Sequence, residues 1–196
     1  MEKIITDSYA IEFESGYDSL IKIIDKKKYS KIFLIVDENT ENYCLNIFKD
    51  KTNLSIELIR IKSGEENKNI HTCIKIWNSL ISMNADRKSL LINLGGGVIT
   101  DIGGFSANTF NRGIDFVNIP TTLLSMGDSC IGSKLSVNYI NFKNQLGGYY
   151  PPTKIFINKD FLNTLPKKEI YSGLGEIAHY YFLSNSKNLN YFQKSM

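Results

Sequence analysis

Short apolar runs alternate with amphipathic segments along the first two-thirds of the chain, and this alternation constrains the fold more than any other feature. Compact runs such as residues 89–94 (SLLINL) have the length and composition of strands buried on both faces. Residues 69–83 instead repeat apolar side chains every three or four positions, as a helix with one buried face does. This alternation predicts βαβ units and an α/β fold with a mostly parallel, Rossmann-like sheet flanked by helices.

The expected elements define one large domain and a short appendage. Strands are predicted at residues 9–15, 31–37, 54–61, 89–94, 116–119 and 154–158. Helices are predicted at residues 17–27, 39–48, 69–83 and 98–110, with a further helix from Pro166. We expect an α/β domain at residues 1–165. Residues 166–196 would then be the first helix of a helical domain, too short to bury a core alone. Residues 123–153 are rich in Gly, Ser, Asn and Tyr, and their weak periodicity predicts no element.

Composition excludes several classes of function. With 42% hydrophobic residues the chain can bury a core, and a net charge of +3 is too small to predict a nucleic-acid or membrane surface. The longest uncharged runs are too short to span a bilayer, and the first residues lack the apolar stretch of a signal peptide. The three cysteines are far apart without CxxC spacing, so we expect reduced thiols and a cytoplasmic location.

The strongest local signal is the segment LINLGGGVITDIGGF at residues 91–105. A strand that ends in three glycines and opens a helix lets backbone N–H groups approach a phosphate closely. The dinucleotide-binding fingerprint is incomplete, because Thr100 stands where its third glycine would be. A glycine turn needed only for packing is the alternative. Polar clusters after the other predicted strands place a ligand cleft at the carboxyl edge of the sheet: Asp37, Asn39, Thr121 and Thr122.

Two further segments carry candidate ligand groups. Residues 112–144 set charged and amide side chains among many small residues, which suits a phosphate or carboxylate ligand but fits a solvated loop equally well. These side chains are Arg112, Asp128, Lys134, Lys143 and Asn144. The segment GDSCIGSK (127–134) is not a P-loop, because Ser133 separates the last glycine from Lys134.

A Glu-x-x-His pair lies in the last predicted helix. Glu176 and His179 are three residues apart, so they share one helix face and could ligate a divalent metal. A solvated acid beside a packed histidine is the alternative. The other histidine, His71, falls at a predicted helix start and is expected to be structural.

In order along the chain, these segments resemble 3-dehydroquinate synthase, within the sugar phosphate cyclases, which are related in fold to glycerol dehydrogenases. The resemblance rests on GGG-x-x-x-D, R-G, P-T-T-L-L, D-S, G-x-K, K-N-x-x-G and a later Glu, with GEENK at residues 64–68. It implies a phosphate-eliminating lyase of the shikimate pathway, which serves aromatic amino acid biosynthesis. Such an enzyme converts a seven-carbon sugar acid phosphate, 3-deoxy-arabino-heptulosonate 7-phosphate, to 3-dehydroquinate. It uses catalytic NAD and one divalent metal, zinc or alternatively cobalt.

The resemblance also implies roles for individual residues. Cofactor contacts are implied at Asp37, Asn39, Glu65, Lys68, Gly96, Gly97, Val98, Asp101, Thr121, Thr122, Lys134, Lys143, Phe161, Asn163 and Thr164. Catalytic or substrate-binding roles are implied at Arg112, Asp128, Lys134, Lys143, Asn144 and His179. Glu176 matches the first metal ligand.

Departures from the family pattern keep other functions open. His179 stands where the family has Lys, Ser133 replaces a Gly, and the two later metal-binding histidines have no counterpart. We expect a homodimer or a completing C-terminal chain. The alternatives are an inactive NAD-binding remnant that lacks the metal half, and a sibling cyclase with another substrate. A third, an NAD-linked polyol dehydrogenase, is disfavoured by the K-N and P-T-T-L-L segments.

Overall fold

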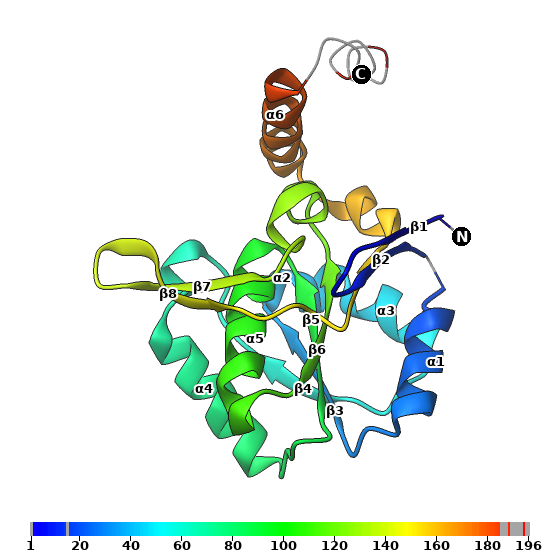
Figure 1. The fold of residues 1–196 in the computed structure, drawn as a ribbon, viewed down its shortest axis with the longest axis vertical. Helices are drawn as coiled ribbons and strands as arrows, with labels where there is room; N and C mark the ends of the chain where they lie inside the picture. Colours follow the sequence, from blue (N-terminus) through cyan, green and yellow to red (C-terminus); the bar gives the residue numbers. More distant parts are fainter. Residues whose placement is uncertain (1, 15, 185–187, 189–193, 195–196) are drawn as a thin grey trace.

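A computed structural model of the chain describes residues 2–14, 16–184, 188 and 194. A central sheet lies between helices, while a hairpin and the last helix project from the body (Figure 1). The sheet strands are β1 (Glu2–Ile5), β2 (Ala10–Phe13), β3 (Ile32–Val36), β4 (Glu57–Arg60), β5 (Leu90–Gly95), β6 (Asp115–Pro120) and β9 (Lys154–Ile157). The hairpin strands are β7 (Lys134–Tyr139) and β8 (Phe142–Tyr149). The helices are α1 (Asp18–Lys27), α2 (Glu38–Tyr43), α3 (Leu45–Thr52), α4 (Ile70–Ser82), α5 (Gly97–Thr109) and α6 (Lys167–Leu183).

The seven-stranded sheet has the order β1-β2-β9-β6-β5-β3-β4. Every neighbouring pair is parallel except β1 with β2. This confirms the predicted α/β fold with a mostly parallel sheet. The antiparallel edge strand β1 was not predicted, and its residues are all exposed, so no apolar pattern marks it.

Side chains that alternate along β3 explain why helices cover both faces of the sheet. Phe33 and Ile35 are buried in the cluster that contains residues of α4 and α5. Leu34 and Val36 point the other way, into the cluster that contains residues of α1 and α3. A strand buried on both faces therefore reads as a continuous apolar run, as the sequence does.

The helix α5 lies very close to the strand before it. A Cβ atom on Gly103 would overlap Oδ1 of Asn93, so only glycine allows this approach. Asn93 is fully buried, and its Nδ2 donates to Oδ1 of Asn118 on β6 over 2.9 Å. This bond joins β5 to β6, and the close approach at Gly103 packs the middle of α5 against β5.

Two predicted regions differ in the structure. The single helix expected at residues 39–48 is two helices, because Cys44 ends α2 and also caps α3 with a φ of −118°. Residues 123–153, predicted without an element, contain the β7–β8 hairpin. The three cysteines are free and buried, and burial raises the pKa of Cys73 to about 11 and of Cys44 and Cys130 to about 12. Such thiols are unreactive at neutral pH.

Candidate functional site

A cleft of about 1040 Å³ opens at the carboxyl edge of the sheet, where the sequence predicted a ligand site. It lies between the ends of β3, β5 and β6, the turn after β4, the hairpin strand β8 and the start of α6. The structure brings most of the predicted cofactor and substrate residues together here. Its lining includes Asp37, Asn39, Glu65, Lys68, Gly96, Gly97, Val98, Asp101, Thr121, Thr122, Lys143, Asn144, Phe161 and Thr164.

The floor of the cleft is the first turn of α5. Gly96 precedes the helix and Gly97 is its first residue, so unpaired backbone N–H groups face the cavity. A Cβ on Gly97 would lie 2.8 Å from Oγ of Ser129, and that buried hydroxyl has no hydrogen-bond partner in the described part of the chain. A helix start with free donors and a nearby unpaired hydroxyl fits a phosphate group, so the residues present fit the diphosphate of a dinucleotide.

Short hydrogen bonds hold the neighbouring strand ends in place. Asp37 caps α2 with its carboxylate, which accepts from the backbone N–H of Thr40 over 2.8 Å. The backbone N–H of Thr121 donates to the carbonyl of Gly95 over 3.1 Å, which joins the ends of β6 and β5. The cleft walls are therefore built on rigid elements.

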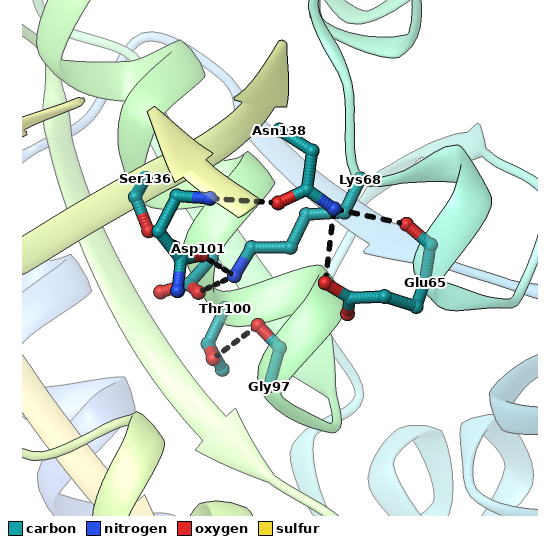
Figure 2. A network of polar contacts seen from close by, with 8 residues as sticks. Glu65, Lys68, Gly97, Thr100, Asp101, Ser136 and Asn138 are labelled. Carbon is teal, nitrogen blue, oxygen red and sulfur yellow. Dashed lines mark hydrogen bonds and ion pairs between the residues drawn. The ribbon is translucent and has the colours of Figure 1, made fainter. Parts of the chain in front are cut away.

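A buried ion pair crosses the cleft between Lys68 and Asp101 (Figure 2). The two side chains are only 7% and 14% exposed. Burial raises the pKa of Asp101, the nearby charges of Glu65 and Asp128 raise it further, and Lys68 opposes the shift. The Lys68 ammonium also donates to Oδ1 of Asn144 over 2.7 Å, so it touches the hairpin as well.

Several predicted residues lie outside the lining. Arg112 lies between α5 and the start of β6, which is the amino edge of the sheet and faces away from the cleft. Lys134, at the start of β7, and Asn163, in the 3-10 turn after β9, are exposed and absent from the lining. Asp128 accepts from the hydroxyl of Tyr180 over 2.6 Å, and this bond raises the pKa of that tyrosine to about 12. The roles predicted for these residues stay predictions.

The metal-binding prediction rests on α6. Glu176 is half-buried on this helix, and His179 on the next turn is exposed. Within the ranges that the structure describes, no group of three His, Cys, Asp or Glu side chains could hold a metal ion. A complete divalent metal site does not fit the residues present, and Glu176 alone supplies one carboxylate ligand.

Some lining residues were not predicted. Ser63 and Gly64 follow β4 at the same sheet edge, so the strand-end argument that found Asp37 could have found them. Ser129 belongs to the D-S pair of the family resemblance but was given no role of its own, because its position beside α5 depends on a π-helical turn at Ser125–Ser129 that the sequence does not mark. The other unpredicted lining residues are Thr40, Tyr43, Cys44, Ile99, Leu124, Leu165, Pro166 and Glu169.

An open parallel sheet, with a glycine-rich helix start beneath a cleft at its carboxyl edge, defines the class of doubly wound α/β proteins. A family model described as "3-dehydroquinate synthase N-terminal" matches residues 58–172, more than half of the chain. The chain belongs to the 3-dehydroquinate synthase family. No helix in the described ranges is long and apolar enough to cross a membrane.

Individual relatives agree with this family. The 3-dehydroquinate synthase of Parabacteroides distasonis is 40% identical over 162 residues, which cover 82% of this chain and 46% of that protein. The enzyme of the same name from Clostridium tetani is 37% identical and covers 95% of this chain and 51% of its own length. The chain thus spans about half the length of these curated relatives.

Solved structures place the fold among sugar phosphate cyclases. ValA, a 2-epi-5-epi-valiolone synthase from Streptomyces hygroscopicus with NAD+ and Zn2+ bound, has a TM-score of 0.78 and 28% identity, covering 89% of this chain and 49% of its own. A 2-deoxy-scyllo-inosose synthase complexed with carbaglucose-6-phosphate, NAD+ and Co2+ has a TM-score of 0.74 and 26% identity, covering 85% and 47%. A maleylacetate reductase from Agrobacterium tumefaciens, at 14% identity, shares the fold.

Proposed function

We propose that this chain is the cofactor-binding part of a 3-dehydroquinate synthase. The substrate would be 3-deoxy-arabino-heptulosonate 7-phosphate and the products 3-dehydroquinate and inorganic phosphate. The assignment includes residues 1–165 as the NAD-binding domain, residues 166–196 as the first helix of the metal-binding domain, and a cytoplasmic location. The same proposal includes a homodimer or a completing C-terminal chain. It includes neither a nucleic acid nor a membrane as a partner.

One observation carries this proposal. The helix start at Gly96 and Gly97 and the hairpin residues Lys143 and Asn144 line the same cleft. The first pair suits the diphosphate of a dinucleotide, and the second offers a cation and an amide to an anionic substrate. A cyclase that oxidises and reduces one bound substrate needs both ligands at one site.

A bound NAD would supply reversible hydride transfer at a substrate carbon that bears a hydroxyl, with the hydroxyl proton lost to a base and later restored, so no net oxidation would occur. The chain's own residues would orient the reactants. Gly97 and its neighbours would bind the diphosphate, and Lys143 would offset the charge of the phosphate that leaves. Asp128 lies outside the cleft lining and accepts a hydrogen bond from Tyr180, and in this proposal it would accept a further hydroxyl from the substrate. No step is assigned to the metal, because the described residues do not complete its site.

A sibling cyclase is the second candidate, because the two solved synthases above act in that wider group and His179 replaces the family Lys. The decisive experiment mixes the purified chain with NAD, zinc and the seven-carbon acid phosphate and follows inorganic phosphate. Release above background supports an active synthase. NAD binding without release at any zinc concentration would mean that this chain is not active alone. NADH accumulation with a polyol would favour a dehydrogenase.

A further inference from the structure

A single asparagine outside the motifs, Asn138, joins the hairpin to the turn after β4. Its backbone N–H donates to the carbonyl of Lys68 over 2.8 Å, and Asn138 forms a parallel β-bridge with Asn69. The end of β7 and the residues that follow the 3-10 turn Glu65–Asn67 therefore run side by side at the edge of the cleft.

The side chain of Asn138 uses both ends of its amide across this junction (Figure 2). Its Nδ2 donates to the carbonyl of Glu65 over 3.3 Å and to the carboxylate of the same residue over 2.9 Å. Its Oδ1 accepts from the backbone N–H of Asn144 over 2.8 Å. One side chain thus holds the turn with its donor and the hairpin with its acceptor.

A second link closes the network. Lys68 reaches back from the turn and donates to Oδ1 of Asn144 over 2.7 Å. Asn144 has a φ of 54°, a left-handed conformation that asparagine adopts more readily than most residues with a side chain. The bond from its N–H to Asn138 stabilises this conformation.

We infer that Asn138 is a positioning residue that makes the turn and the hairpin move as one unit. This inference rests on the proposed function, because the turn carries the proposed cofactor contacts Glu65 and Lys68. The hairpin carries the proposed substrate contacts Lys143 and Asn144. The amide of Asn138 acts together with the backbone bond to Lys68 and the Lys68–Asn144 bond, and so couples the position of the substrate contacts to that of the cofactor contacts.

Two substitutions separate the two ends of the amide. Asn138→Ala removes both, whereas Asn138→Asp keeps an oxygen acceptor for Asn144 but loses the donor and sets a carboxylate against that of Glu65. The matched control is Asn141→Ala, since Asn141 is exposed in the turn of the same hairpin. Amide hydrogen exchange is followed by mass spectrometry in residues 64–69, 142–149 and 90–95, and NAD binding is followed by titration.

In the chain without ligand, both Asn138 variants should exchange about tenfold faster in residues 64–69, while only Asn138→Ala does so in 142–149. The central strand at 90–95 and the Asn141→Ala control should match wild type. The NAD dissociation constant should rise about tenfold in both Asn138 variants, the scale of one hydrogen bond to a charged group.

Unchanged exchange at 64–69 in both Asn138 variants would overturn the inference. An equal increase in all three segments would also overturn it, because it would show general destabilisation instead of a local tie. A wild-type chain that does not bind NAD would contradict the proposed function, and the exchange pattern without ligand would still decide the role of Asn138.

Discussion

At the scale of single residues, the cleft contains polar groups that the protein itself leaves unsatisfied or only just compensates. The hydroxyl of Ser129 is buried without a partner beside the first turn of α5, and the carboxylate of Asp101 is buried against one cation, Lys68. Both arrangements cost folding free energy. A ligand that bonds to the Ser129 hydroxyl could recover the cost there. The ion pair with Lys68 limits the cost of burying Asp101. We therefore expect substitution of Ser129 to leave stability unchanged and substitution of Lys68 to lower it.

We expect Ser129→Ala to weaken NAD binding by about 5- to 20-fold, the loss of one or two hydrogen bonds to a ligand, without lowering the melting temperature. The hydroxyl has no hydrogen-bond partner among the residues that the structure describes, so its removal leaves none of their polar groups unsatisfied. Isothermal titration with NAD and thermal unfolding without it measure the two effects. Ser106→Ala is the matched control, because Ser106 is fully buried on α5 and lies outside the cleft. Equal NAD affinity in wild type and Ser129→Ala would contradict the prediction.

Lys68→Met should destabilise the folded chain by about 3–5 kcal/mol at pH 7, because it leaves Asp101 charged and buried without its cation. The pKa of Asp101 is already raised by burial, and losing Lys68 raises it further. Protonation then removes the uncompensated charge, so the deficit should shrink as the pH falls through that raised pKa.

Urea unfolding of wild type and Lys68→Met from pH 7 to pH 4 measures this dependence on pH. The double variant Lys68→Met/Asp101→Asn should recover most of the lost stability at pH 7, because no buried charge remains. A deficit that does not change with pH would rule out the uncompensated carboxylate as its cause.

At the scale of elements, the sequence predicted what burial dictates and missed what specific contacts dictate. The strands at residues 31–37 and 89–94 were found because they are buried on both faces. The hairpin strand β8 was missed because nearly all its side chains are exposed, so no apolar period marks it. The break at Cys44 contains neither proline nor glycine and is a change in the backbone of Cys44 itself, with a φ of −118°, so no residue type in the sequence marks it. Strand-end logic located the cleft, but not Ser129 or Asn138, whose positions depend on turns and long-range hydrogen bonds.

The docking of α6 gives a prediction at this scale, because two glycines of that helix have opposite surroundings. A Cβ on Gly173 would lie 2.6 Å from the backbone nitrogen of Leu124, whereas no atom of the described residues lies within 4 Å of one on Gly175. We expect Gly173→Ala to destabilise the chain by about 1–3 kcal/mol through overpacking. Gly175→Ala should instead stabilise it by about 0.5–1 kcal/mol, because alanine favours the helix.

Thermal unfolding of the two glycine variants measures the expected loss of stability in Gly173→Ala and the expected gain in Gly175→Ala. Limited proteolysis between the domain and α6 should also be faster in Gly173→Ala, because the contact with Leu124 holds the helix against the loop after β6. Loss of stability in both variants to the same extent would mean that helix docking at Gly173 is not the cause.

At the scale of the whole molecule, many residues line the site proposed for NAD, whereas the described residues supply only one carboxylate to the site proposed for the metal. The cleft at the sheet edge collects cofactor-type contacts from several elements. On α6, Ile170, Leu174 and Ile177 are half-buried, while Phe182 is 68% exposed, so part of the apolar side of this helix stays uncovered. Glu176 has no set of partner ligands in the described part of the chain. We therefore expect this chain to bind NAD without binding zinc, and the two ligands can be tested one at a time.

We expect NAD alone to stabilise this chain and zinc alone to leave it unchanged. At 100 times its dissociation constant, NAD should add about 2.7 kcal/mol to the free energy of unfolding by mass action, which raises the melting temperature by about 5–10 °C for a domain of this size. Equimolar zinc should not shift the melting temperature, because one carboxylate and an exposed histidine three residues away leave the tetrahedral coordination of zinc incomplete. Thermal scans with NAD, with zinc and with both measure these shifts, and Glu176→Ala provides the comparison. A rise at equimolar zinc that Glu176→Ala abolishes would show that this chain completes a metal site by itself, and the separation of the two functions would then be wrong.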